Sequence, residues 1–146
     1  MRHYDIYLME KDVARHYFGQ ESKLFHLFLE QKKATAEFKA IYEKQIEFIT
    51  RPISTLQLQQ LVGQAFKHSQ HYEQFKNTHY LSISHPFSQA ELTLNPTMIT
   101  VTSDGGYEAE TIFFEVLRKY DACFFAMDIN DFRFGWLNPI KQVKLI

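Results

Sequence analysis

Hydrophobic and polar residues follow two periods along this chain, and the change from one to the other predicts a mixed α and β fold. The opening residues, RHYDIYLM, alternate with a period of two and predict a strand in which Tyr4, Ile6 and Leu8 share one face. A helical period follows, interrupted at Gly19 and ended by Pro52. It predicts helices at about residues 10–18, 20–32 and 35–49, and a second apolar stripe after Pro52 predicts one more helix, so that helices are expected up to about residue 68.

The helix expected at 35–49 has a regular apolar stripe that contains one polar residue. The stripe is formed by Phe38, Ile41, Tyr42, Ile46 and Ile49. Gln45 falls inside it, four residues after Ile41, and the simplest interpretation is a residue at the edge of the stripe. After Pro52, Ser54 and Gln57 fit a capping box that would start the next helix.

The second half of the chain returns to a period of two near residue 79. The stretches YLSIS, AELTL and MITVT predict three successive strands, and their short, proline-containing connections suit an antiparallel meander. The segment YEAETIFFEVLRKYD then predicts the clearest helix of the chain. Its first turn carries Glu108 and Glu110 and its last turn Arg118 and Lys119, so each end complements the helix dipole. ACFFAM and FRFGWL predict two final strands.

This order of elements predicts a single α+β domain over residues 1–146. We expect a largely antiparallel sheet of about five to six strands, packed with helices mainly on one face. A chain of 146 residues is long enough to enclose one substantial hydrophobic core.

Charge and cysteine content narrow the classes of function. The formal net charge is −1, with 16 Lys and Arg against 17 Asp and Glu, and no block of like charge appears. A nucleic-acid interface needs a basic stripe, so direct DNA or RNA binding is not expected. One cysteine permits no internal disulfide, and no apolar run has the length of a signal peptide core or a membrane span. We therefore predict a cytoplasmic protein that does not enter the membrane.

No set of residues in the sequence predicts catalysis, a metal site or a cofactor. His68 and His71 are three residues apart, but no Cys or carboxylate stands at a metal-ligand spacing from them, so two exposed histidines near a helix end are expected. Cys123 lies in an apolar run, typical of an inert core thiol. The stretch SDGGYEAE lacks the lysine of a phosphate loop, and Glu108 and Glu110 would point different ways on a helix.

The stretch DVARHYF, residues 12–18, raises the question of an interaction surface. At helical spacing Val13 and Tyr17 share one face, while Ala14 and Phe18 share the next face round. One pair is expected to pack into the core and the other is left without a role. Aromatic residues make up 16% of the chain, and large rings are favoured at protein interfaces as well as in cores. From the residues alone, a protein-interaction module is therefore favoured over an enzyme.

Five blocks of the sequence, taken in order, closely resemble the sporulation inhibitor of replication family, SirA, of endospore-forming bacteria. They are RHYDIYLM, ARHYFGQES, EKQIEFITRPI, YEAETIFFEVLRKYDACFFAMD and RFGWLNPIK. The resemblance includes both ends of the chain and is limited to the general pattern over about residues 55–103. It implies a regulator without enzymatic activity that binds domain I of the replication initiator DnaA and prevents new rounds of replication during sporulation.

The same resemblance implies where the partner binds. In the family the contact surface involves the first short helix and the glutamine of the EKQ motif, which correspond here to Val13, Tyr17 and Gln45. Ala14 and Phe18 would then turn toward the core. The family carries an aromatic residue at the position of Val13, so valine offers a smaller contact and Tyr17 is expected to matter more. The implied assembly is a monomer that forms a one-to-one complex. The alternatives are a module for a different protein partner or a small DNA-binding regulator.

Overall fold

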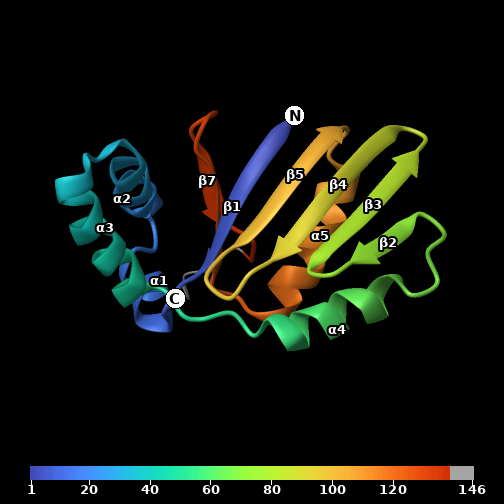
Figure 1. Cartoon of the computed structure of the whole chain (residues 1–146), viewed down its shortest axis with the longest axis horizontal. Coiled ribbons are helices and arrows are strands. Elements are labelled where there is room, and N and C mark those ends of the chain that lie inside the picture. Colours follow the sequence, from blue (N-terminus) through green and yellow to red (C-terminus); the bar gives the residue numbers. More distant parts are fainter. Residues whose placement is uncertain (139–146) are drawn as a thin grey trace, which may run out of the picture.

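A computed structural model describes residues 1–138, and the predicted turn at Pro139 lies outside the described residues. Within this part the chain forms five helices and seven strands (Figure 1). The strands are β1 (Arg2–Leu8), β2 (Tyr72–Phe75), β3 (Thr78–Ser84), β4 (Phe87–Leu94), β5 (Ile99–Gly105), β6 (Phe124–Asp128) and β7 (Arg133–Trp136). The helices are α1 (Lys11–His16), α2 (Glu21–Lys33), α3 (Ala36–Ile49), α4 (Thr55–Phe66) and α5 (Glu108–Tyr120).

All seven strands belong to one antiparallel sheet with the order β2-β3-β4-β5-β1-β6-β7. The predicted α+β class and the antiparallel sheet are confirmed. The strand missing from the prediction is β2, which pairs with β3 at the edge of the sheet. The first strand of the sequence, β1, lies inside the sheet, between β5 and β6.

Helix α5 covers one face of the sheet and supplies much of its core. Ala109, Phe113 and Leu117 recur every four residues and are completely buried. They face the same side as Ile6 and Val101, which are also fully buried. Replacing a buried phenylalanine such as Phe113 by alanine typically lowers the free energy of unfolding by about 3–5 kcal/mol. The packing of this ring therefore holds α5 firmly against the sheet.

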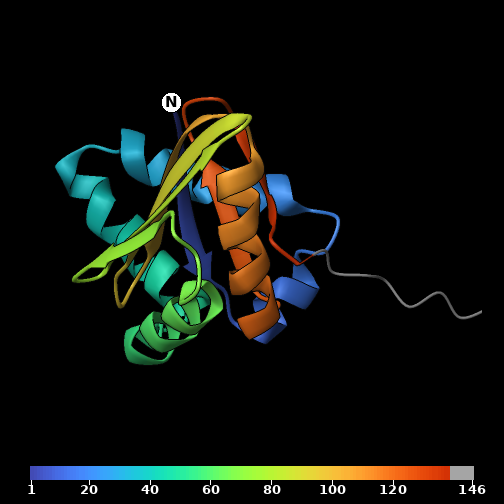
Figure 2. The same ribbon diagram turned by 90° about the vertical axis from the view of Figure 1, so that its right-hand side faces the viewer.

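Helix α2 covers the opposite face, but only over β1, β6 and β7. The ring of Phe28 packs on Tyr7 with centroids 4.6 Å apart, and Phe25 stacks on Phe134 at 4.8 Å. Lys32 places its Nζ 3.0 Å from the buried Asp5. The helices therefore lie on both sides of the sheet, as Figure 2 shows with α3 and α5 on opposite sides of β1.

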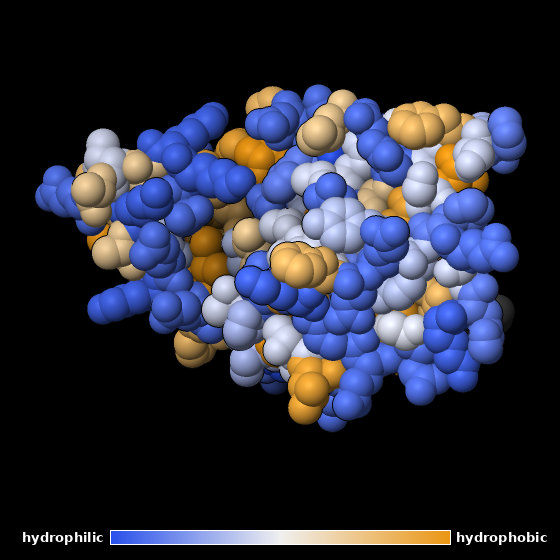
Figure 3. Space-filling view, turned by 45° about the vertical axis from the view of Figure 1, so that its right-hand side comes forward, coloured by the Kyte–Doolittle hydropathy of each residue, from blue (hydrophilic) through white to orange (hydrophobic). Residues whose placement is uncertain are grey.

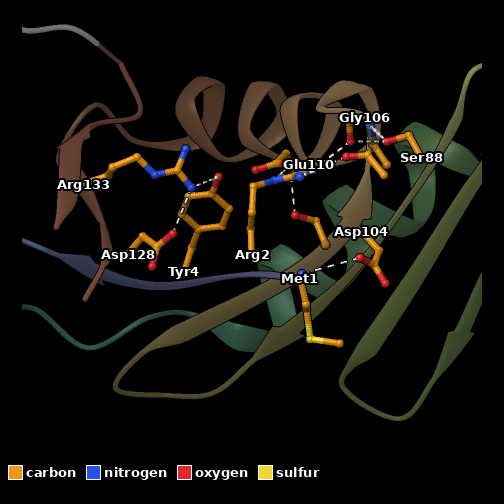
Figure 4. A network of polar contacts seen from close by, with 12 residues as sticks. Met1, Arg2, Tyr4, Ser88, Asp104, Gly106, Glu110, Asp128 and Arg133 are labelled. Carbon is orange, nitrogen blue, oxygen red and sulfur yellow. Dashed lines mark hydrogen bonds and ion pairs between the residues drawn. The ribbon is translucent and has the colours of Figure 1, made fainter. Parts of the chain in front are cut away.

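A buried polar network joins the start of β1 to the start of α5 (Figure 4). Arg2 donates from Nε to Glu110 at 2.7 Å and from its two terminal nitrogens to the carbonyl oxygens of Gly105 and Gly106, at 2.9 and 2.8 Å. The Ser103 hydroxyl donates to the same Glu110 oxygen at 2.9 Å. Glu110 is 2% exposed, and Arg2 is the cation that pairs with its carboxylate.

Candidate functional site

The short helix α1 is defined by its backbone and ends earlier than the sequence pattern indicates. The Ala14 N–H donates to the Glu10 carbonyl oxygen at 3.0 Å, and the N–H of Tyr17, the C-cap residue, donates to Val13 at 3.0 Å. Gly19 then has a φ of +79°, a left-handed conformation that glycine adopts without strain. The chain reverses there and enters α2, so Phe18 lies outside the helix.

The sequence suggested that one of two pairs, Val13 with Tyr17 or Ala14 with Phe18, packs into the core. In the structure neither pair is fully buried and neither is fully exposed. Ala14 is 2% exposed and packs into the core, as the spacing predicts. Phe18 is only partly buried. Val13 and Tyr17 are partly buried as well, and both rest against the core from its edge. Each of them keeps part of its side chain accessible to a partner.

Helix α3 has an unusual relation to the rest of the fold, because it buries none of its fourteen residues fully. It packs on α2 and leaves a row of large apolar side chains exposed: Phe38 at 54%, Ile41 at 54% and Phe48 at 84%. The spacing of these residues puts them on one face with Gln45, which is also exposed. We call Phe38, Ile41, Gln45 and Phe48 the α3 stripe.

The structure divides the apolar stripe expected from the sequence into two rows, and Phe38 and Ile41 belong to the exposed one. The inner row of α3 consists of Tyr42, Ile46 and Ile49, which are partly buried. Gln45 lies between the two rows, next to Tyr42 and Ile49 on the inner side and to Ile41 and Phe48 on the outer side, which agrees with a residue at the edge of the core-facing stripe. It is surrounded on the outer surface by apolar neighbours, which is the arrangement of a polar group inside a largely apolar contact patch.

The start of α1 and the end of α3 are joined by backbone hydrogen bonds. The Glu10 N–H donates to the Ile49 carbonyl oxygen at 2.9 Å, and the Arg51 N–H donates to Leu8 at 2.7 Å. The Arg51 side chain adds a bond to the Met9 carbonyl at 3.0 Å and two bonds of 3.1 Å to Asp121. This joint fixes α1 relative to α3. Tyr17 lies at the opposite end of α1 from the joint, and Gln45 lies about one turn before it on α3.

Figure 1 places α1, α2 and α3 together at one side of the molecule, beyond β1 and away from β2. The helical end is thus separated from the meander of β3, β4 and β5. The interacting residues implied by the sequence, Val13, Tyr17 and Gln45, all belong to this end. Val13 lies on α1, Tyr17 is the C-cap of that helix and Gln45 lies on α3, while the exposed Phe48 beside Gln45 was not singled out from the sequence.

The candidate chemical groups do not assemble into a reaction centre. Among residues 1–138, no group of three or more His, Cys, Asp or Glu side chains could hold a metal ion. His68 and His71 share no helix, because α4 ends at Phe66. Cys123 is buried, and burial raises the pKa of its thiol, which disfavours the reactive thiolate. Glu108 is exposed, whereas Glu110 is engaged with Arg2.

The capping box predicted at the start of α4 does not form. Ser54 is the N-cap of α4 as predicted, but its side chain makes no capping hydrogen bond. Gln57, expected in the capping box, accepts a hydrogen bond from the Tyr120 hydroxyl at 2.8 Å instead. None of the helices in the described part combines the length and the apolar character that crossing a bilayer requires.

Comparison with known proteins gives a match over nearly the whole chain. Residues 2–141 match the family described as sporulation inhibitor of replication protein SirA. A curated protein of that name from Bacillus subtilis (strain 168) is 41% identical over 147 residues, which is 99% of this chain and 99% of the relative. The resemblance seen in the sequence blocks therefore extends through residues 55–103 as well.

Proposed function

Because the chain belongs to the SirA family of sporulation inhibitors of replication, we propose that it binds domain I of the replication initiator DnaA and thereby blocks new rounds of chromosome replication. The family consists of regulatory proteins rather than enzymes, so inhibition is by binding. The observation that carries the proposal is the α3 stripe, a row of exposed apolar side chains around Gln45 next to the accessible part of α1.

The proposed contact surface combines Tyr17 and Val13 of α1 with the α3 stripe. Tyr17 has a large apolar body with a polar tip and few rotamers to lose, which suits an interface anchor. Val13 adds a smaller apolar contact. Three large side chains with exposed fractions of 54% or more would lose water from their surfaces on binding, at a gain of about 25 cal/mol for each Å² covered.

Gln45 gives this surface its selectivity in the proposal. A partner that covers Gln45 must offer both a donor and an acceptor, because leaving a buried amide without partners costs on the order of 1–3 kcal/mol. The mechanism is steric: a small folded protein occupies the surface of domain I and prevents its other contacts without making or breaking a covalent bond. The complex is one monomer to one domain I, formed in the cytoplasm where the chromosome is replicated.

The test is isothermal titration calorimetry of the full chain with purified cognate DnaA domain I. Gln45→Ala gives the clearest result, because the exposed side chain adds nothing to the core and the variant should fold normally. We expect Tyr17→Ala and Phe48→Ala to weaken binding by more than about fivefold, the loss of an interface anchor. Circular dichroism and urea unfolding check that each variant is folded, which matters for Tyr17 because it also touches the core.

Phe75→Ala is the matched control for Phe48→Ala. Phe75 is 67% exposed on β2, at the other side of the molecule, and its removal takes away a similar apolar surface. Unchanged affinity in this variant would support a local contact at α1 and α3. Failure of the wild-type chain to bind domain I would refute the proposed partner, and full binding by Gln45→Ala, Tyr17→Ala and Phe48→Ala would refute the proposed surface.

A further inference from the structure

Strands β2 to β5 have one face that no element of the described chain covers. Helix α5 packs against their other face, and Figure 1 shows it behind these strands with nothing in front of them. Side chains alternate accordingly: His79, Leu81 and Leu92 are buried on the covered side, whereas Tyr80 and Glu91 point to the open side. A hollow of about 380 Å³ lies on this open face.

A row of three side chains crosses the hollow, with an aromatic ring between two carboxylates. Glu73 of β2 lies directly opposite Tyr80 of β3, and Tyr80 lies directly opposite Glu91 of β4. Opposed residues on neighbouring antiparallel strands have Cβ atoms about 5 Å apart, so the side chains of Glu73 and Glu91 start on either side of Tyr80 and are long enough to reach its ring. Tyr80 is 36% exposed, and Glu73 and Glu91 are exposed as well.

Negative charge predominates on this face, although the amino group of Met1 and Lys76, whose Nζ lies 5.4 Å from the centroid of the exposed Phe75 ring, add positive charge. The described residues that line the hollow include the carboxylates of Glu73, Glu91 and Asp104 but no Lys or Arg. The amino group of Met1, 3.6 Å from Asp104, balances that carboxylate. Glu73 and Glu91 make no ion pair with another described residue. A concave surface on which one charge sign predominates concentrates its field and attracts the opposite charge.

Figure 3 looks obliquely at this side of the molecule and shows mostly hydrophilic and intermediate residues, with hydrophobic ones lying singly among them. An apolar partner surface therefore finds no continuous patch to cover here. A cationic group finds a ring face and carboxylate acceptors in reach of one another, which is the combination that recognises a guanidinium or ammonium ion.

We propose that the open face of β2 to β5 binds an arginine-bearing segment of a protein partner, with the guanidinium over the Tyr80 ring between Glu73 and Glu91. Arginine fits better than lysine because its planar group stacks on a ring while its N–H donors reach carboxylates at the sides. This face is separate from the proposed DnaA surface, since α1 and α3 lie at the other side of the molecule. Both surfaces are open to partners at the same time.

The experiment titrates a hexa-arginine peptide into the full, ¹⁵N-labelled chain and follows amide chemical shifts by NMR. The expected result is saturable shifts at Tyr80, Glu91 and their neighbours, with α3 unaffected. Glu73→Gln/Glu91→Gln should weaken the affinity by about tenfold, the effect of two partly exposed charge contacts. A hexa-lysine peptide should bind more weakly, and Tyr80→Leu should reduce the difference between the two peptides.

Glu43→Gln/Glu47→Gln is the matched control, because it removes the same charge from exposed positions of α3. Unchanged affinity in this variant supports the site. Equal weakening by both double variants, shifts centred elsewhere or no saturable binding would overturn the proposal. Shifts on this face that depend on protein concentration without peptide would also overturn it, because a second copy would then be the occupant.

The result is independent of the DnaA proposal. The Glu73→Gln/Glu91→Gln protein is expected to bind DnaA domain I with the affinity of the wild type in the same calorimetric assay. Loss of peptide binding with retained domain I binding would show that the two surfaces act separately. Loss of both in a folded variant would overturn the assignment of a second, distinct surface.

Discussion

His79 should make the stability of this protein depend on pH below neutrality. The side chain is completely buried on β3, where its ring contacts Gln59 of α4 and Tyr72 of β2. Its Nε2–H donates to Gln59 Oε1, since that oxygen is an acceptor only, and its Nδ1 accepts from the Tyr72 hydroxyl at 2.5 Å. Both ring nitrogens are thus satisfied in the neutral form. A second proton on Nδ1 would reverse the direction of the Tyr72 hydrogen bond and carry a charge into the core.

The magnitude follows from the pKa. Burial lowers the pKa of His79 from 6.5 to about 4. Above pH 6.5 the residue is neutral in the folded and unfolded chains, and its stabilising effect is fully present. As the pH falls from 6.5 toward 4, the unfolded chain binds a proton that the folded chain does not, so stability decreases. The total loss is about 3 kcal/mol, of which about 2 kcal/mol is lost by pH 5.

The assay is urea unfolding followed by far-ultraviolet circular dichroism at pH 7 and pH 5, for the wild type and His79→Gln. The glutamine can still bond to Gln59 but does not titrate, so the variant should lose about 2 kcal/mol less than the wild type between the two pH values. The other six histidines are exposed and remain in the variant, so the difference between the two proteins reports on the buried His79 ring. An NMR titration should find the His79 ring neutral down to about pH 5.

An equal change in unfolding free energy for wild type and His79→Gln would refute this reasoning. So would a ring that titrates near pH 6.5 in the folded protein, because the buried environment would then not disfavour the charge. If His79→Gln fails to fold, the NMR titration of the wild type still decides the question.

Two further substitutions test the contacts around Arg2 and the turn at the end of β5. Arg2→Met should lower the free energy of unfolding in urea by about 3–5 kcal/mol, because it leaves the carboxylate of Glu110 buried without its cation. The double variant Arg2→Met/Glu110→Leu should recover part of this loss. No recovery would mean that the ion pair is not the cause. Gly105→Ala should destabilise by at least about 1 kcal/mol, because Gly105 has a φ of +76° and an added Cβ would lie 2.5 Å from a backbone oxygen of β4. Gly135→Ala, where an added Cβ meets nothing within 4 Å, should change the unfolding midpoint less, and equal effects would contradict the steric explanation.

The periods in the sequence predicted nearly every element, because most segments have one buried side. The predicted helix at 35–49 and the helix beginning near Glu108 match α3 and α5 closely. β2 was missed because it has only four residues, YEQF, which show no apolar alternation, and three of the four are exposed. An edge strand with one partner and one uncovered face leaves little hydrophobic signal.

The sequence did not predict that α2 covers the face of the sheet opposite α5, because periodicity does not show which elements pack together. Asp5 in RHYDIYLM looks like a solvent-facing residue, yet it is buried beneath α2 and paired with Lys32. The same limit applies to α3. Its periodicity shows that the helix has two different sides, but only the packing on α2 shows that Phe38 and Ile41 are on the outer one.

The candidate site was reached through family resemblance rather than through spacing. Val13 and Tyr17 could have packed inward or outward by the pattern alone, and the structure places both at the border between core and surface. Gln45 was the one residue with a local signal, a glutamine within an apolar stripe. The sequence also contains a weaker indication for Phe48. This apolar residue lies outside the row of Tyr42, Ile46 and Ile49, and it follows Gln45 by three residues.

The position of β1 in the middle of the sheet constrains how the protein folds as it is synthesised. Its backbone partners are β5, at residues 99–105, and β6, at residues 124–128, so the first strand made cannot pair with β5 until about residue 105 has been made, nor with β6 until about residue 128. Such distant pairing slows folding, because a long loop must close before the contacts form. The helices α1 to α3 are translated early, but the joint through Leu8, Met9 and Arg51 orients them only when β1 is held. A nascent or truncated chain therefore carries the residues of the proposed inhibitory surface without presenting them in a fixed arrangement.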